Sequence, residues 1–242
     1  MSEIIGRQPV LEVLKSQQSI NKLLLAKGER KGTIFEILKL AKEKRVPIQQ
    51  VEKKYLDKMF PGKNHQGVVA YVSVTDYVDW QDLLARARER KEEPLLVILD
   101  EIEDPHNLGA ILRTVDAVGA HGVIIPKRRA VGLTEGVAKA SAGAVNYVPV
   151  ARVANIAQIL EALKKEGLWI VGTSLKGENL YKQNLQGPLA IVIGNESKGL
   201  SRLVEEKCDF LISIPMQGEI NSLNASVATG IVLYEILRQR MV

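Results

Sequence analysis

The chain has 242 residues, of which 46% are hydrophobic and 25% charged, and it carries a formal net charge of +5. These values are typical of a globular protein with one large or two small domains, and they exclude disordered and fibrous proteins. The sequence has no apolar run of the ~18 residues that span a membrane, no secretory signal and only one cysteine, Cys208, so we expect a cytosolic protein without an internal disulfide.

Residues 1–74 alternate helical and extended patterns. Apolar residues three and four positions apart, Ile34, Ile37, Leu38 and Ala41, predict a helix, and short β-rich runs such as "INKLLLAK" and "GVVAYVSV" predict strands. Residues 1–72 hold 14 Lys and Arg against 7 Asp and Glu, so the basic charge of the protein is concentrated here. A compact basic unit predicts a module that binds a polyanion, with nucleic acid as the expected ligand, although a lysine-rich solvated surface is the plain alternative.

The next segment, "DYVDWQDLLARARERKEE", is charged and has a helical pattern, and Pro94 follows it. We interpret residues 75–93 as a linker with one short helix. The expected organisation is therefore a small α/β domain over 1–74, this linker, and a larger domain over 94–242.

From residue 94 onward, strands and helices alternate regularly. The expected strands are "LLVILD", "GVIIP", "LWIVGTS", "LAIVIGN" and "FLISIP", and the expected helices are "NLGAILRTVDAVGA", "VANIAQILEALKKEG" and residues 223–240. Continuous apolar strands separated by helices predict a parallel sheet that is covered on both faces. Ligands of such folds bind at the carboxyl ends of the strands, where this sequence has "DEIEDPHN", "GTS", "GNESKG" and "PMQGEINS".

Several common kinds of site do not fit these loops. The first strand of this half does not lead into the G-x-G-x-x-G pattern that binds dinucleotides, which disfavours a dehydrogenase. The loop "GNESKGLS" has the glycine spacing of a phosphate loop, but Leu200 stands where the lysine belongs. One cysteine and three scattered histidines, His65, His106 and His121, provide no zinc site and no cysteine protease site. We expect each histidine to be a surface or loop residue, and we expect no metal.

The candidates for chemistry are five polar residues: Asn107, Arg113, Glu196, Ser222 and Asn224. Each also has an ordinary structural explanation. Asn107 could cap the helix that follows it, and Glu196 could accept hydrogen bonds from loop N–H groups. Arg113 could face solvent, although its apolar neighbours suggest a partly buried place where an arginine needs a partner.

The last helix raises a related question, because "GEINSLNASVATGIVLYEIL" opens with Asn221, Ser222, Asn224 and Ser226. Ser and Asn at a helix start accept hydrogen bonds from the N–H groups of the first turn, but one such cap is enough. The surplus indicates that this helix start also meets a ligand, since helix N-termini favour anionic groups.

Three ordered motifs in residues 94–240 contain all five candidates. They are "DPHNLGAILRTVDAVGAHGVII" with Asn107 and Arg113, "LAIVIGNESKGLS" with Glu196, and "ISIPMQGEINSLNASVATGIVLYE" with Ser222 and Asn224. In these motifs the sequence resembles the SpoU/TrmH family of RNA ribose 2′-O-methyltransferases, within the SPOUT superfamily. The N-terminal stretches "GRQPVLEVL" and "NHQGVVA" are similar to the small ribosomal-protein-like RNA-binding domain of many members.

The resemblance implies an α/β fold: a parallel-sheet methyltransferase domain with a trefoil knot, preceded by a small α/β RNA-binding domain. Generic topology rules would not predict the knot. In the family, the knotted loops bind S-adenosylmethionine, and the corresponding residues here are Thr173, Gly194, Ile214, Met216 and Leu223. A glycine at 194 suits a close approach of the backbone to a ligand.

The implied reaction is transfer of a methyl group from the sulfonium of S-adenosylmethionine to a ribose hydroxyl. The family pattern assigns the central role to Arg113, but a guanidinium stays protonated in proteins. We expect Arg113 to bind the phosphate beside the target ribose, and Glu196, or a water that it orients, to accept the proton. Asn107 would position the ribose or Arg113, while Ser222 and Asn224 would order the cofactor or the target nucleotide.

The layout most resembles the bacterial enzymes that methylate a guanosine of large-subunit (23S) ribosomal RNA, and family members are homodimers. The alternatives are a transfer RNA substrate, a ribosomal RNA adenosine as in resistance-type relatives, or a non-catalytic RNA-binding or ribosome-assembly protein that keeps the fold. A nucleotide-dependent oxidoreductase is a further class, which would bind nicotinamide and transfer no methyl group.

Overall fold

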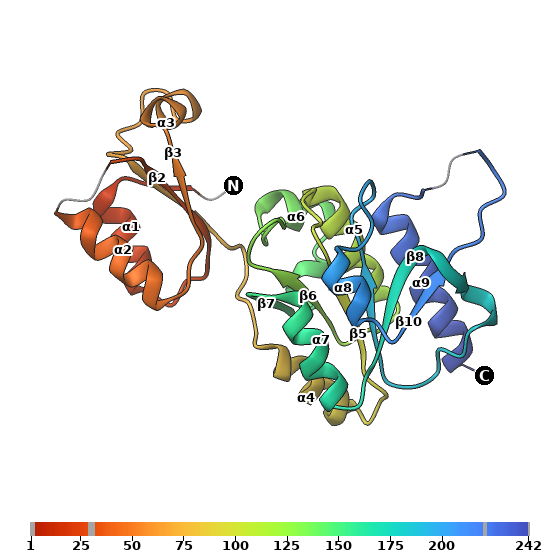
Figure 1. The fold of residues 1–242 in the computed structure, drawn as a ribbon. Helices are drawn as coiled ribbons and strands as arrows, with labels where there is room; N and C mark the ends of the chain where they lie inside the picture. Colours follow the sequence, from red (N-terminus) through yellow and green to blue (C-terminus); the bar gives the residue numbers. More distant parts are fainter. Residues whose placement is uncertain (1–2, 29–31, 220–221, 242) are drawn as a thin grey trace. The chain divides into compact units, whose positions relative to one another are not determined.

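The structure is a computed structural model, and it describes residues 3–28, 32–219 and 222–241. The chain forms two compact units. The first consists of Met1–Asp76 with Gly132–Glu135, and the second of Tyr77–Val131 with Gly136–Val242. We call them the N-terminal unit and the C-terminal unit, and each is described by itself (Figure 1).

The N-terminal unit is a four-stranded sheet with helices on both faces. Its elements are β1 (Glu3–Ile5), α1 (Arg7–Lys15), β2 (Ile20–Ala26), α2 (Thr33–Glu43), β3 (Ile48–Val51), α3 (Lys53–Met59) and β4 (Val68–Val72). The strand order is β1-β4-β2-β3, in which only β2 and β3 are parallel. Because side chains alternate along β2, Leu23 and Leu25 pack with α1 and α2, while Leu24 and Ala26 pack with α3.

The two N-terminal motifs meet within this unit. Arg7 donates from its backbone N to Gln66 Oε1 and from Nε to the Gln66 backbone oxygen, both at 3.0 Å. His65 is 4% exposed; its Nδ1 accepts from the Gly67 N–H at 3.0 Å, and its Nε2 lies 2.8 Å from Asp57 Oδ1. His65 is therefore a loop residue, as expected, but it is not at the surface: its ring is buried and holds the shape of this loop.

The C-terminal unit is built on a six-stranded parallel sheet in the order β10-β8-β9-β5-β6-β7. From Tyr77 onward the elements are α4 (Trp80–Arg90), β5 (Leu95–Leu99), α5 (Pro105–Ala117), β6 (Gly122–Pro126), α6 (Glu135–Ala140), η1 (Ala144–Asn146), β7 (Val150–Val153), α7 (Ile156–Lys165), β8 (Trp169–Asn179), η2 (Leu180–Lys182), β9 (Leu189–Ile193), α8 (Arg202–Lys207), β10 (Phe210–Ser213) and α9 (Ala225–Arg240).

Helices cover both faces of this sheet, as the apolar strands predict (Figure 1). On one face, Leu83 of α4, Leu160 of α7 and Val204 of α8 pack against strand residues such as Ile98 and Val192. On the other face, α5 and α9 contact each other. The carboxyl ends of all six strands therefore meet at one edge, which is where a ligand site is expected.

The α/β class, the parallel sheet and the small N-terminal domain are thus confirmed. The trefoil knot stays a prediction from the resemblance, because strand order alone does not define how the chain is threaded. The sequence did not predict the short strands β1 and β7 or the short helices α6 and α8, since segments of three to six residues carry little periodicity.

The segment expected to be a linker differs from that description. Its helix is present as α4, but Leu83, Leu84 and Ala87 are buried in the core of the C-terminal unit. Asp79 and Asp82 form a capping box at its start. The charged residues that suggested a linker lie on the exposed face of a packed amphipathic helix.

His121, just before β6, is also buried, with 1% of its surface exposed. Its Nδ1 accepts a hydrogen bond from the Leu95 N–H at 3.0 Å, and its Nε2 lies 3.1 Å from Glu92 Oε2. Burial lowers the pKa of His121, and the nearby Glu92 carboxylate only partly opposes this. His121 is thus a loop residue, as expected, but a buried one, whereas His106 is exposed at the start of α5.

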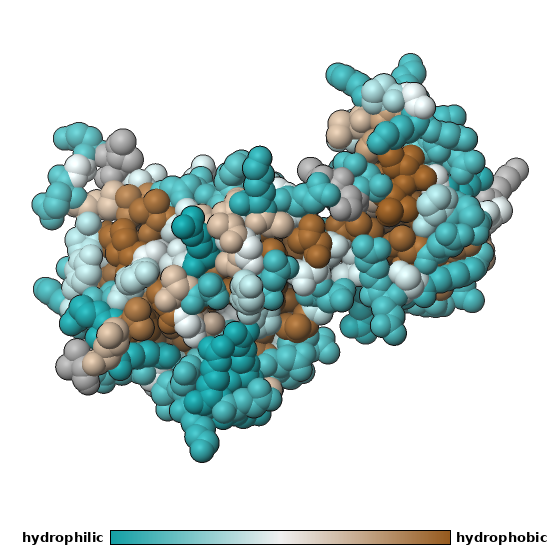
Figure 2. Space-filling model, turned by 180° about the vertical axis from the view of Figure 1, so that it is seen from behind, coloured by the Kyte–Doolittle hydropathy of each residue, from teal (hydrophilic) through white to brown (hydrophobic). Residues whose placement is uncertain are grey.

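Hydrophilic residues cover most of the face shown in Figure 2, and hydrophobic residues are visible there in smaller areas. No helix in the described part of the chain combines the length and the hydropathy that a bilayer-spanning segment needs. Among the same residues, no group of three or more His, Cys, Asp or Glu side chains is placed to hold a metal ion.

Candidate active site

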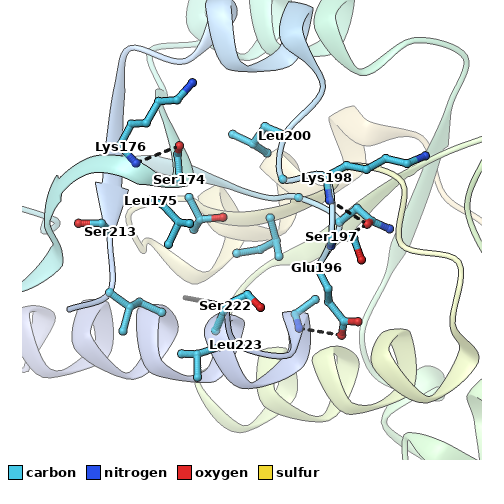
Figure 3. A pocket seen from close by; sticks show the side chains of 18 of the residues that line it. Ser174, Leu175, Lys176, Glu196, Ser197, Lys198, Leu200, Ser213, Ser222 and Leu223 are labelled. Atoms are coloured by element: carbon cyan, nitrogen blue, oxygen red, sulfur yellow. Dashed lines mark hydrogen bonds between the residues drawn. The ribbon is translucent and has the colours of Figure 1, made fainter. Parts of the chain in front are cut away.

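A cavity of about 710 Å³ opens at the carboxyl ends of β8, β9 and β10. Its walls come from residues 173–176 and 193–200, from Glu205 of α8, and from residues of two further segments: Ile212, Ser213, Ile214 and Met216, and Ser222, Leu223, Ala225 and Ala228. Figure 3 shows these segments around the cavity, with Ser222 and Leu223 lying opposite Ser174 and Leu175. The volume lies within the ~300–1,000 Å³ of small-molecule and cofactor sites, and the place is the one that the sheet topology favours.

All five residues predicted to bind the cofactor line this cavity: Thr173, Gly194, Ile214, Met216 and Leu223. Two of the predicted catalytic residues, Glu196 and Ser222, also line it. Thr173 is held by a hydrogen bond from its Oγ1 to the Val192 oxygen at 3.1 Å. Asn221 of the polar helix start lies outside the described residues.

At Gly194 the structure shows a close approach of the backbone within the protein, while the close approach to a ligand stays a prediction. A Cβ atom at this position would lie 2.4 Å from the carbonyl carbon of Gly199 and 2.5 Å from the Leu200 nitrogen. The two ends of the loop are joined by the Asn195 and Gly199 backbones, which exchange hydrogen bonds of 3.0 and 2.8 Å. The close approach that requires glycine is therefore made by the loop itself, and it shapes the cavity wall.

Glu196 connects three parts of the site through one carboxylate oxygen. Its Oε1 accepts hydrogen bonds from Asn107 Nδ2 at 2.9 Å, Asn224 Nδ2 at 2.6 Å and the Ala225 backbone N at 3.1 Å. The last of these bonds is drawn in Figure 3. Asn224 Nδ2 also donates to Asn107 Oδ1 at 2.8 Å. Asn107, Glu196 and Asn224 come from three separate motifs, and they form one network at the edge of the cavity.

The polar start of α9 serves two purposes. Asn224 is the N-cap, and its Oδ1 accepts from the backbone N of Ser226 and of Val227 at 3.0 and 3.3 Å, and from Ser226 Oγ at 2.6 Å. Its Nδ2 points the other way, into the network with Glu196. Asn107, in contrast, is no cap: Asp104 caps α5, and Asn107 is 8% exposed inside that helix.

Arg113 is the predicted catalytic residue that lies neither in this network nor on the cavity wall. It lies two turns into α5 with its side chain exposed, and it does not line the cavity. No other described residue makes a hydrogen bond or an ion pair with its guanidinium. Of the two possibilities that the sequence left open for Arg113, the solvent-facing side chain is confirmed and the partly buried one is wrong, because the buried stripe of α5 is formed by its apolar residues.

Several cavity residues were not singled out from the sequence. Lys176 lines the cavity with its Nζ 3.8 Å from Glu205 Oε1, and Lys198 projects from the same loop as Glu196 (Figure 3). Their positions were the available signal, since Lys176 follows the expected strand "LWIVGTS" and Lys198 follows β9, and ligands bind at the carboxyl ends of strands. Cys208 is not reactive, because burial raises the pKa of its thiol to about 12.

Comparison with known proteins agrees with this geometry. The SpoU rRNA Methylase family matches residues 94–234, and the domain described as RNA 2′-O ribose methyltransferase substrate binding matches residues 4–78. A Bacillus subtilis protein, YacO, named for the TrmH family of tRNA/rRNA methyltransferases, is 53% identical over 98% of this chain and 95% of its own length.

Solved structures match as well. The SpoU methyltransferase AviRb from Streptomyces viridochromogenes, in complex with the cofactor AdoMet, is 28% identical with a TM-score of 0.63 over 99% of this chain and 90% of its own. A structure concerning 2-OH methylation of C/U34 on tRNA is 29% identical with a TM-score of 0.56, over 62% of this chain and 97% of its own. Because the family match covers more than half of the chain and YacO matches nearly all of it, the protein belongs to the SpoU/TrmH family of RNA methyltransferases.

Proposed function

We propose that this protein transfers a methyl group from S-adenosylmethionine to the 2′-hydroxyl of a ribose in RNA, and that its target is a guanosine of large-subunit ribosomal RNA. The observation that carries the proposal is the junction of the cavity with the network of Asn107, Glu196 and Asn224. The cofactor can then bind in the cavity, and methyl transfer can take place beside it, at the polar network on the same edge of the sheet.

The residues of the cavity suit S-adenosylmethionine. Apolar side chains such as Ile193, Ile214 and Leu223 can surround a flat adenine ring, and the Glu205 carboxylate complements a cofactor that carries an ammonium and a sulfonium. When bound, the cofactor supplies the electrophilic methyl carbon. Thr173, Gly194, Ile214, Met216 and Leu223 would hold it.

The network assigns distinct roles to the two oxygens of Glu196. Three donors hold Oε1, which fixes the carboxylate, whereas no described residue donates to Oε2. Oε2 accepts the proton of the ribose hydroxyl, directly or through a water. Asn107 and Asn224 position Glu196, and Ser222, on the cavity wall, orders the cofactor or the target nucleotide.

Arg113 binds the phosphate beside the target ribose. Its exposed guanidinium has no partner among the described residues, so its donors remain available for a bidentate contact. A lysine at this position would keep the positive charge but could not make two parallel hydrogen bonds to one phosphate, so Arg113→Lys tests this assignment.

The coverage of the related structures favours ribosomal RNA. The tRNA-directed structures match 62% and 66% of this chain, whereas an AdoMet-bound rRNA methyltransferase from Sinorhizobium meliloti, 26% identical with a TM-score of 0.59, matches 98% of it. Residues 1–72, with 14 Lys and Arg against 7 Asp and Glu, would supply contacts to the phosphates of the larger RNA. The names of relatives such as YacO include both RNA classes, so transfer RNA is the second candidate.

A homodimer is part of the same proposal. Val227 and Tyr234, seven residues apart on one face of α9, are 50% and 54% exposed. An apolar stripe on a helix that already packs with α5 on its other side suits a second copy of the chain. Light scattering of the purified protein tests this, and Tyr234→Asp should shift it to monomer. A cytosolic location likewise stays a prediction.

The test of the function is transfer of labelled methyl from S-adenosylmethionine to unmodified ribosomal and transfer RNA in parallel, with nuclease mapping of the labelled nucleoside. We expect 2′-O-methylguanosine in large-subunit RNA, and none with Arg113→Ala. Label in transfer RNA alone would overturn the substrate, label on an adenosine would overturn the base, and cofactor binding without any transfer would favour a binding protein that keeps the fold.

A further inference from the structure

Glu101 joins the loops that follow three different strands of the C-terminal unit. It lies just after β5, and its Oε1 is 2.8 Å from Arg129 Nη1 in the loop after β6. Its Oε2 is 3.8 Å from Lys198 Nζ in the loop after β9, and its backbone oxygen accepts from Asn195 Nδ2 at 3.2 Å. The carboxylate, 19% exposed, thus faces two cations at the same sheet edge as the cavity.

The two closest partners are held in an uncommon backbone conformation. Glu101 has φ of 59° and Arg129 has φ of 55°, in the left-handed region that residues with a Cβ rarely adopt. Such conformations persist only where the surrounding structure holds them, and they concentrate at functional sites. The loop "PKRRA", residues 126–130, therefore has a fixed backbone conformation, from which its basic side chains project at this edge of the sheet.

The cations themselves remain open to solvent. The side chains of Arg129 and Lys198 are 76% and 77% exposed. Arg128 is exposed as well, and no other described residue bonds to its guanidinium. Lys198 also lines the cavity, so this cluster borders the place where the reaction would occur. We call Arg128, Arg129 and Lys198 the basic rim.

We infer that the basic rim is a second RNA-binding surface, on the C-terminal unit, and that it binds backbone phosphates beside the target nucleotide. In the free protein, Glu101 is the counter-ion that positions Arg129 and Lys198, and the RNA phosphates replace Glu101 when RNA binds. The inference rests on the proposed function. Guanidinium forks match the oxygens of a phosphate, and an exposed ion pair is weak enough in water to be exchanged for one. None of the three motifs of the family contains Arg128, Arg129 or Glu101.

The chain offers a matched control for this pair. Arg88 in α4 is 70% exposed, and its Nη2 lies 2.8 Å from Glu166 Oε2, so it repeats the ion pair of Arg129 and Glu101 away from the cavity. The variants to compare are Arg129→Ala, Arg128→Ala and Glu101→Gln against Arg88→Ala and Glu166→Gln, all in the full chain.

The experiment measures the affinity of each variant for an unmodified large-subunit ribosomal RNA transcript over a salt series, with S-adenosylmethionine affinity and Tm as checks. We expect Arg129→Ala and Arg128→Ala each to weaken binding by about threefold to tenfold and to reduce the slope of log K against log salt by about 1, as loss of one phosphate contact does. Glu101→Gln should tighten binding by at most about fivefold, because it releases Arg129 and Lys198, both exposed cations, from their ion pairs with Glu101. Both control variants should match the wild type.

An equal salt slope for Arg129→Ala and Arg88→Ala would overturn the inference. Weaker RNA binding by Glu101→Gln at unchanged Tm would also overturn it. If Arg129→Ala lowers the Tm, its loss of affinity is not specific, and the inference is then judged by whether Glu101→Gln tightens or weakens RNA binding. RNA binding is measured apart from methyl transfer, so a wild type that transfers no methyl group would refute the proposed function and still leave the basic rim tested.

Discussion

Replacing Glu196 by glutamine separates its two proposed tasks. Glutamine keeps an oxygen that can accept from Asn107, Asn224 and the Ala225 N–H, which lie 2.6–3.1 Å from Oε1. The second oxygen becomes an NH₂ group, which cannot accept a proton. We therefore expect Glu196→Gln to retain the fold and the cofactor site and to lose methyl transfer.

The two effects differ enough in size to be distinguished. Loss of the carboxylate charge at the start of α9 costs about 0.3–1 kcal/mol, with the lower part of this range expected because Glu196 is exposed. For a chain of this length that corresponds to a fall in Tm of at most ~4 °C. Loss of a general base lowers kcat by about 10²–10⁴, and the lower limit is equivalent to ~2.7 kcal/mol of barrier.

Thermal unfolding, calorimetric titration with S-adenosylmethionine and single-turnover methyl transfer measure these quantities on one preparation. The control is Glu206→Gln, which removes an exposed carboxylate paired with Arg202 outside the cavity. Turnover within threefold of the wild type, with Tm and cofactor affinity unchanged, would refute the role of Glu196 as proton acceptor and leave it a positioning residue.

Three further results are expected. Gly194→Ala should lower the free energy of unfolding by about 1–3 kcal/mol and weaken cofactor binding, because the new Cβ would lie 2.4 Å from the Gly199 carbonyl carbon. The control is Gly187→Ala, where a Cβ would have no atom within 4 Å, and it should change neither the thermal stability nor the cofactor affinity. Arg113→Lys should leave the Tm unchanged and reduce turnover at least about tenfold, since the charge stays but the bidentate contact is lost; near-normal turnover would refute the phosphate contact. The free energy of unfolding of the wild type, measured with urea, should fall as the pH drops below about 6.5. The reason is that the pKa of His121 is lower in the folded protein than in the unfolded chain, so the unfolded chain is protonated first as the pH falls. His121→Gln should reduce this pH dependence.

The sheet of the C-terminal unit could be predicted because each of its long strands is a continuous apolar run between helices. The family resemblance supplied the five predicted cofactor residues, and all of them line the cavity at this shared edge of the parallel sheet. The sequence also suggested a partly buried Arg113, although the buried positions Leu108, Ile111, Leu112 and Val115 already define a stripe that excludes it. That error came from reading neighbours in sequence instead of neighbours on the helix.

Contacts between distant loops could not be predicted in this way. Glu101 and Arg129 are 28 residues apart, and no periodicity links them. The burial of His121 depends likewise on Leu95 and Glu92, which lie more than 25 residues earlier. Such pairs depend on which strands become neighbours in the sheet, and that order is a property of the whole fold.

The residue at the start of α9 shows how structure and function can require the same side chain. Asn224 uses its oxygen to cap the helix and its nitrogen to hold Glu196 and Asn107. Aspartate would cap the helix as well, but it would place a second carboxylate against Glu196 at the 2.6 Å now taken by an N–H donor. Serine would cap with a shorter side chain and could not span both partners. Of the common N-cap residues, asparagine is the one that offers an acceptor and a donor on opposite sides of one planar group, so the helix start is polar because it is both an end and a part of the site.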